Sequence, residues 1–192
     1  MWVAVLVVLF CWAGGARAEV TGAIVLDPGH GGANVGAPGR VIAGAQAYEK
    51  QVTLAVAQRV RGLLVAQGYR VVMTREDDRY LTLRERVRRA NAARPLLFLS
   101  LHANASPDHS QRGIETFVLD RSVAEVEGRR HAQQAAGVVD ALLRDVRASH
   151  WLAESARLGR LLQDSLVTLR GALDRGLRQA DHDVLSGVQA PA

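Results

Sequence analysis

The order of apolar and polar residues predicts strands and helices that alternate along the chain. Short apolar or alternating runs bounded by turn residues are typical of strands. They lie at residues 23–27, 69–75, 95–103 and 113–120. Between them, apolar residues recur at helical spacing over 48–68 and 82–94. Strands that alternate with helices in this way indicate an α/β fold.

The two predicted helices have recognisable ends. Helix 48–68 finishes at Gly68, because glycine readily adopts the left-handed conformation that ends a helix. Helix 82–94 begins at Thr82, and Glu85 stands at the spacing of a capping box. The first helix carries an apolar stripe that we expect to face the sheet. The stripe consists of Val52, Val56, Val60, Leu63 and Leu64.

Three stretches depart from this pattern. Residues 28–40 contain two prolines and five glycines, so we expect a loop without regular structure. Residues 121–150 are polar, rich in Arg and Ala and partly helical, and we interpret them as a helical insert. A further helix is predicted over about 152–169, and the tail after it has only short apolar pieces.

The first 18 residues predict a secretory signal peptide. An apolar run too short to span a bilayer comfortably is followed by Ala16-Arg17-Ala18, which matches a cleavage site. Because no Lys or Arg precedes the run, a poor membrane anchor is the alternative. Cleavage would leave one domain over 19–192, without a stable membrane span and without Cys11, the only cysteine. A metal site in that domain must use His, Asp or Glu.

The composition indicates an ordinary globular protein with a basic surface. The chain has 192 residues, a formal net charge of +5 and 24 basic residues, of which Lys50 alone is not arginine. A basic balance favours anionic partners such as nucleic acid or cell-wall polymers. The arginines are scattered among acidic residues, and aromatic residues make up 5% of the chain, too few to stack bases. We therefore expect no nucleic-acid binding.

Three residues of metal-ligand type fall at one edge of the predicted sheet. His30 follows the first strand and His102 ends the third, and the carboxyl ends of parallel strands form sites at a common edge. Glu49 opens the first helix on the face of the apolar stripe, where an unpaired carboxylate is costly. Two imidazoles and one carboxylate with an open fourth position are typical of a catalytic zinc site, which suits amide hydrolysis.

Each of these residues also has a simpler explanation. His30 could only form loop hydrogen bonds, Glu49 could favour the positive end of its helix, and His102 could cap a strand. The glycines around His30 also allow a dinucleotide-binding turn, with Glu49 as an acidic residue about twenty positions later. That fingerprint fails, because its third glycine position holds Asn34.

The chain resembles a known family in several motifs. These are IVLDPGHGG at 24–32, YEK at 48–50, LSLHANA at 99–105 and GIETF at 113–117. In combination they resemble the zinc-dependent N-acetylmuramoyl-L-alanine amidases of bacterial cell walls. The similarity covers residues 23–117 closely and returns weakly from residue 152 onward.

The resemblance implies a fold, a substrate and a set of ligands. The fold would be a mixed, mostly parallel sheet flanked by helices. The substrate would be the amide between N-acetylmuramic acid and L-alanine of the peptidoglycan stem peptide. An exported monomer in the periplasm or cell wall would cleave it during wall remodelling or daughter-cell separation. Matched motif by motif, His30, Glu49 and His102 would hold zinc.

The sequence departs from the family pattern at its end. Family members continue into a hydrophobic strand that ends in a catalytic glutamate, whereas this sequence stops at Ala192. We therefore expect a sheet that lacks its C-terminal strand, and the catalytic base stays unassigned, with Glu115 and Glu154 as weak substitutes. A non-catalytic, amidase-like peptidoglycan-binding protein is the alternative function.

The resemblance also bears on the helical insert at 121–150. Some members of the family carry a helical segment here that covers the active site until a partner removes it. The insert is therefore either a blocking arm on which an activator protein acts, or an ordinary surface helix.

Overall fold

A computed structural model describes residues 22–42, 44–106, 112–120, 122 and 137–192. The predicted signal peptide lies outside the described residues, and so do residues 121 and 123–136 of the predicted insert. In the described ranges no helix combines the length and the apolar character needed to cross a membrane.

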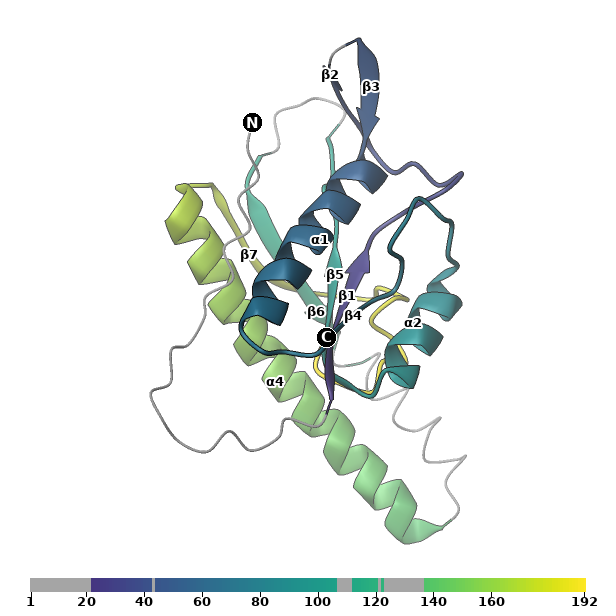
Figure 1. The fold of residues 1–192 in the computed structure, drawn as a ribbon. Helices are drawn as coiled ribbons and strands as arrows, with labels where there is room; N and C mark the ends of the chain where they lie inside the picture. The colour runs from purple at the N-terminus through teal and green to yellow at the C-terminus, as the bar shows by residue number, and fades with distance from the viewer. Residues whose placement is uncertain (1–21, 43, 107–111, 121, 123–136) are drawn as a thin grey trace.

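A three-stranded parallel sheet forms the centre of the molecule (Figure 1). Its strands lie in the order β4 (Val71–Met73), β1 (Ala23–Pro28) and β5 (Pro95–Leu101). Parallel strands covered by helices on both faces are apolar on both sides. This explains why β1 reads as a continuous apolar run and is almost entirely buried.

Helices α1 (Glu49–Ala66) and α2 (Leu83–Ala92) belong to two separate hydrophobic cores. Leu26 of β1 packs in the core that contains Val60 of α1. Its neighbour Val25 packs in the other core, with Ala90 of α2. Successive side chains of a strand point to opposite faces, so β1 anchors both cores.

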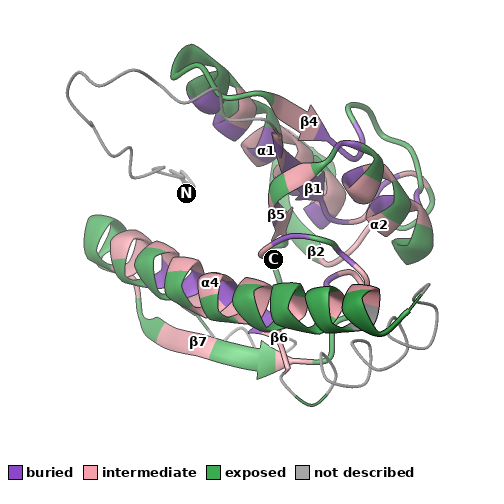
Figure 2. Cartoon of the chain, turned by 90° about the horizontal axis from the view of Figure 1, so that it is seen from below, coloured by how far each residue is buried: buried purple, intermediate pink, exposed green. Residues whose placement is uncertain are grey.

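A second parallel pair packs against a long helix, as Figure 2 shows. The pair consists of β6 (Ile114–Leu119) and β7 (Asp174–Ala180), and the helix is α4 (Val138–Arg170). The buried amide of Gln163 in α4 joins the two strands. Its Nε2 donates to the carbonyl of Ile114 in β6 (2.7 Å) and to Oδ1 of Asp174 in β7 (2.6 Å), and its Oε1 accepts from the hydroxyl of Thr116 in β6 (2.8 Å). A buried side chain with both ends bonded fixes where β6 meets the helix.

The structure confirms an α/β fold with a parallel sheet flanked by helices, but it corrects the prediction of a loop over 28–40. Part of that stretch belongs to an antiparallel hairpin of β2 (Pro38–Ile42) and β3 (Ala45–Tyr48). Proline is tolerated at the first residue of an exposed edge strand, because its missing N–H leaves no bond unmade there. All of β2 is exposed.

Two further predictions were wrong in detail. Helix α4 has 33 residues and begins at Val138, well before the predicted start near 152. Leu63 of the predicted apolar stripe is 47% exposed, whereas α1 buries Thr53 and Ala57 instead of Val52 and Val56. The tail also contains a strand, β7, that its mixed composition did not reveal.

The described part of the predicted insert consists of residue 122 and the beginning of α4. Residues 137–150 form its first turns and lie at the end of the molecule opposite to the β2–β3 hairpin (Figure 1). The C-terminal residues contact both β5 and α4. The N–H of Phe98 in β5 donates to the carbonyl of Pro191 (2.9 Å), and the N–H of Ala192 donates to Oγ of Ser155 in α4 (2.9 Å).

An ion pair lies inside the fold. Asp27 at the end of β1 is 1% exposed, and Arg86 of α2 is 3% exposed. The guanidinium of Arg86 donates to Oδ1 of Asp27 (2.7 Å). Thr74 and Ser100 also donate to this carboxylate, at 2.5 and 2.8 Å. The carboxylate thereby ties β1 to β5, to the end of β4 and to α2.

We expect Asp27→Ala to lower the free energy of unfolding by about 3–5 kcal/mol, because it leaves Arg86 buried without its partner. Asp77→Ala is the control, since it removes a carboxylate of an exposed ion pair with Arg79 and should change stability little. Urea denaturation of both variants measures the difference. Equal effects of the two substitutions would contradict the role of the buried pair.

Candidate metal centre

Three side chains meet at the carboxyl-terminal edge of the central sheet. His30 lies in the loop after β1, His102 directly follows β5, and Glu49 is the first residue of α1. Strands β1 and β5 are parallel neighbours, so their ends present His30 and His102 side by side. The structure therefore brings together the three residues that the sequence singled out.

The carboxylate of Glu49 lies between the two imidazoles. Its Oε2 is 3.1 Å from Nε2 of His30, and its Oε1 is 3.0 Å from Nδ1 of His102. The ligand atoms of all three residues lie within 4.8 Å of one another. The two rings meet edge to face, with their centres 4.9 Å apart.

Backbone groups hold the Glu49 carboxylate in place. The N–H of Ala37 donates to Oε2 (2.9 Å), and the N–H of Ala103 donates to Oε1 (2.8 Å). Burial raises the pKa of Glu49, but the hydrogen bonds from His102, Ala37 and Ala103 and the charge of His30 outweigh it. Together they lower the pKa to about 2, so the carboxylate is ionised at neutral pH.

The loop and a hydrogen bond fix the orientation of His30. Its backbone φ is +62°, an unusual value for a residue with a side chain. Its Nδ1 lies 2.8 Å from Oδ1 of Asn34. An amide oxygen only accepts, so this bond places a ring proton on Nδ1, and Nε2 is the nitrogen that faces Glu49.

His102 packs directly over Gly29. A Cβ at position 29 would lie 2.4 Å from Cε1 and 2.6 Å from Nε2 of the imidazole, so any larger residue would displace the ring. The backbone N–H of Gly29 also donates to the carbonyl of Leu101 (2.9 Å). The first glycine after β1 thus provides the space into which His102 fits.

The donor set fits a zinc ion. Two neutral imidazole nitrogens and one carboxylate oxygen are a known ligand set of catalytic zinc, which leaves a fourth position open. Metal-bound histidines usually donate their second ring nitrogen to an oxygen acceptor, and Asn34 supplies one to His30. Sequence reasoning passed over Asn34, although its position four residues after His30 in a tight loop is the available signal.

Residues 24–192 match a family model described as N-acetylmuramoyl-L-alanine amidase. The chain belongs to this amidase family. AmiC of Neisseria meningitidis serogroup B is 32% identical over 185 residues, which cover 88% of this chain and 43% of that protein. LytC of Bacillus subtilis is 31% identical over 169 residues, 88% of this chain and 27% of LytC. The chain thus spans less than half the length of these two amidases.

Solved amidase structures share the fold. The crystal structure of N-acetylmuramoyl-L-alanine amidase from Clostridium difficile 630 matches with a TM-score of 0.65 and 25% identity, over 88% of this chain and 75% of that one. The catalytic domain of the amidase CwlV from Bacillus (Paenibacillus) polymyxa matches with a TM-score of 0.58 and 27% identity, over 88% and 76%.

A cavity of about 220 Å³ adjoins the candidate metal centre. His30, His102 and Asn34 form one side of it. Tyr80 and Leu83 also line it and are 54% and 47% exposed. An apolar and aromatic rim beside the ligands offers a surface on which a substrate can rest.

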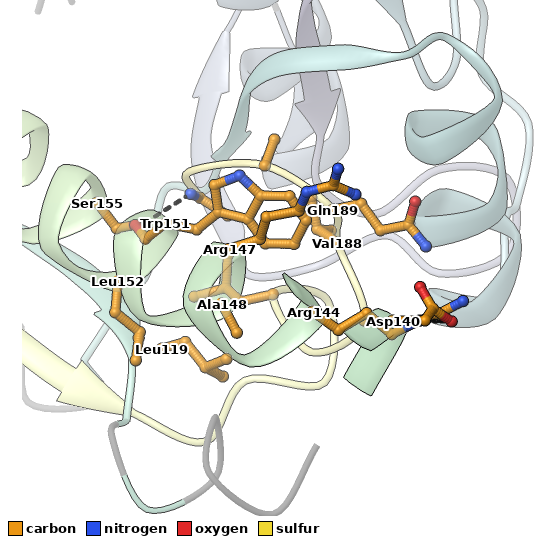
Figure 3. Close-up of a pocket in the computed structure, with 14 residues that line it drawn as sticks. Leu119, Asp140, Arg144, Arg147, Ala148, Trp151, Leu152, Ser155, Val188 and Gln189 are labelled. Carbon is orange, nitrogen blue, oxygen red and sulfur yellow. Dashed lines mark hydrogen bonds and ion pairs between the residues drawn. The ribbon is translucent and has the colours of Figure 1, made fainter. Parts of the chain in front are cut away.

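A larger cavity, of about 280 Å³, lies elsewhere, between α4 and the C-terminal residues (Figure 3). Arg144, Arg147 and Trp151 line it from α4, and Val188 and Gln189 line it from the other side. None of the described residues that line it is a candidate metal ligand. The larger cavity is therefore separate from the candidate metal centre.

The two glutamates considered as substitute bases are both held by arginines. Glu115 in β6 accepts from Nε of Arg175 (3.0 Å), and Arg178 lies 3.5 Å from the same carboxylate. Glu154 in α4 lies 3.8 Å from Arg157. Neither glutamate belongs to the cluster around Glu49 among the described residues.

We expect Gly29→Ala to lower the free energy of unfolding by about 1–3 kcal/mol, because the added methyl group collides with the His102 ring. Gly62→Ala is the matched control. Gly62 lies in α1 with open space around it, and alanine should raise helix stability there by about 0.5–1 kcal/mol. Urea denaturation of both proteins tests this, and a shift in the same direction would refute the steric explanation.

A pH-dependent effect is expected for Glu49→Gln in metal-free protein. A lowered pKa stabilises the fold fully above the usual value of 4.5, and this contribution disappears as the pH falls towards about 2. The parent should therefore exceed the variant in stability more at pH 6 than at pH 3. Denaturation in the presence of a chelator measures both values, with the surface substitution Glu76→Gln as the control. A difference that is constant with pH would speak against the buried, ionised carboxylate.

Proposed function

We propose that this protein is a zinc-dependent hydrolase that cleaves the amide between N-acetylmuramic acid and L-alanine of the peptidoglycan stem peptide. The observation that carries the proposal is the position of one buried carboxylate, Glu49, between the nitrogens of His30 and His102. Membership of the amidase family supports the choice of substrate.

The residues around the site have defined tasks in this proposal. His30, Glu49 and His102 would hold zinc, and bound zinc supplies a Lewis acid for the amide carbonyl. Asn34 keeps the proton of His30 on Nδ1, so that Nε2 stays available as a ligand. The adjoining cavity with Tyr80 at its rim would receive the sugar and peptide on either side of the amide.

We further propose that the protein acts as an exported monomer in the periplasm or cell wall, in wall remodelling or daughter-cell separation. The predicted signal peptide supports export, and the net charge of +5 suits an anionic wall polymer. A partner protein that acts on residues 121–150 also remains a proposal.

A non-catalytic peptidoglycan-binding protein is the second candidate. The pairing of Glu115 and Glu154 with arginines favours it, because neither glutamate is placed to accept a proton at the metal centre. The two candidates predict the same zinc site but different products.

Digestion of purified peptidoglycan distinguishes them. We expect the zinc-loaded protein to release stem peptides with a free N-terminal L-alanine, detected by mass spectrometry, and His102→Ala to lose this release. Removal of zinc by a chelator should have the same effect, and zinc should restore it. Sedimentation with peptidoglycan without any released peptide would support the binding protein. Release of sugars or cleavage between amino acids would contradict the amidase.

A further inference from the structure

The backbone of Gly29 connects the neighbours of all three candidate ligands. Gly29 precedes His30, and its N–H donates to the carbonyl of Leu101, which precedes His102. Its carbonyl accepts from Nη2 of Arg75 (2.7 Å). The same Nη2 donates to the carbonyl of Lys50 (2.9 Å), which follows Glu49. One guanidinium nitrogen therefore joins the His30 loop to the first turn of α1.

The remaining hydrogen bonds of Arg75 reinforce this connection. Its Nε donates to the carbonyl of Pro28 (2.9 Å), and its Nη2 lies 3.1 Å from Oγ1 of Thr53. Thr53 in turn donates to the carbonyl of Gly29 (2.8 Å). The printed sequence gives no sign of these contacts, because 22 to 47 positions separate Arg75 from these four residues.

The environment of Arg75 is unusual for a residue that only stabilises a fold. Its side chain is 1% exposed, and its hydrogen bonds among the described residues end on backbone carbonyls and the Thr53 hydroxyl. A buried charge that is not bonded to a carboxylate is costly. Arg86, in contrast, is bonded to Asp27. The free-energy cost of burying the Arg75 guanidinium is explained if its hydrogen bonds are needed to position the candidate ligands.

We propose that Arg75 is a positioning residue of the metal centre. Its planar guanidinium holds the backbone of Pro28 and Gly29 at a fixed place relative to Lys50, and this sets the distance between His30 and Glu49. The inference rests on the proposed function, because it assumes that these ligands bind zinc. Lysine cannot replace arginine here, since one ammonium group cannot reproduce a rigid fork that bonds four carbonyls.

We expect Arg75→Lys to weaken zinc binding by about 10–100-fold, the usual effect of losing a residue that supports metal ligands. Competition with a chromophoric chelator measures the dissociation constant. The visible absorption of the Co²⁺-substituted protein reports the ligand geometry, and it should change in the variant. Both measurements are independent of hydrolysis.

Two controls separate positioning from stability. The guanidinium of Arg89 donates to the carbonyl of Thr74 (2.9 Å), the residue that precedes Arg75. Arg89→Lys should leave zinc affinity unchanged. Val60→Ala removes a core contact of α1 and should lower stability without changing zinc affinity or the Co²⁺ spectrum. If Arg75→Lys lowers stability but binds zinc as tightly as the parent, the inference is overturned.

A second variant covers the case in which Arg75→Lys does not fold. Thr53→Val keeps the shape of the side chain and removes the hydroxyl that bonds Gly29 and Arg75. It should weaken zinc binding several-fold, and unchanged affinity would overturn the inference. Failure of the parent itself to bind zinc would instead overturn the proposed function, so the two failures can be told apart.

Discussion

The buried carboxylate of Glu49 is the interaction on which the rest of the site depends. An ionised group that is 4% exposed needs compensation, and the two imidazoles and two backbone N–H groups provide it. These partners come from the loop after β1, from the segment before β2 and from the end of β5. The carboxylate therefore brings together the loop between β1 and β2, the first turn of α1 and the end of β5, and the same convergence creates a set of candidate metal ligands.

The buried residues that support the loop of His30 contribute both to the stability of the fold and to the geometry of the candidate site. Asp27 and Arg86 tie the central sheet to α2, and Nη2 of Arg86 also donates to the carbonyl of His30 (2.7 Å). Arg75 connects the same loop to α1. The loop can thus keep His30 in a left-handed conformation that would be costly in isolation, because buried hydrogen bonds on both sides determine its path. Substitutions here are expected to affect folding and metal affinity together.

Sequence reasoning found the candidate ligands because two simple rules apply to them. The ends of neighbouring parallel strands placed His30 and His102 at one edge, and helical spacing placed Glu49 on the buried face. It did not find Arg75 or Asn34, whose roles depend on tertiary contacts. The β2–β3 hairpin was missed because proline and glycine, here Pro38 and Gly39, are unfavourable in strands. They are tolerated in β2 because this strand is fully exposed. The buried face of α1 was misjudged by one residue, because valines at 52 and 56 only flank it.

The central claim is that His30, Glu49 and His102 form one zinc site, and the zinc content of purified protein tests it most directly. Residues 19–192, dialysed against trace zinc and analysed by mass spectrometry for metals, should contain about one zinc ion per chain. His102→Ala and Glu49→Gln should lose it, while Glu154→Gln should retain it. A well-folded parent without zinc, or His102→Ala with the zinc content of the parent, would contradict the claim.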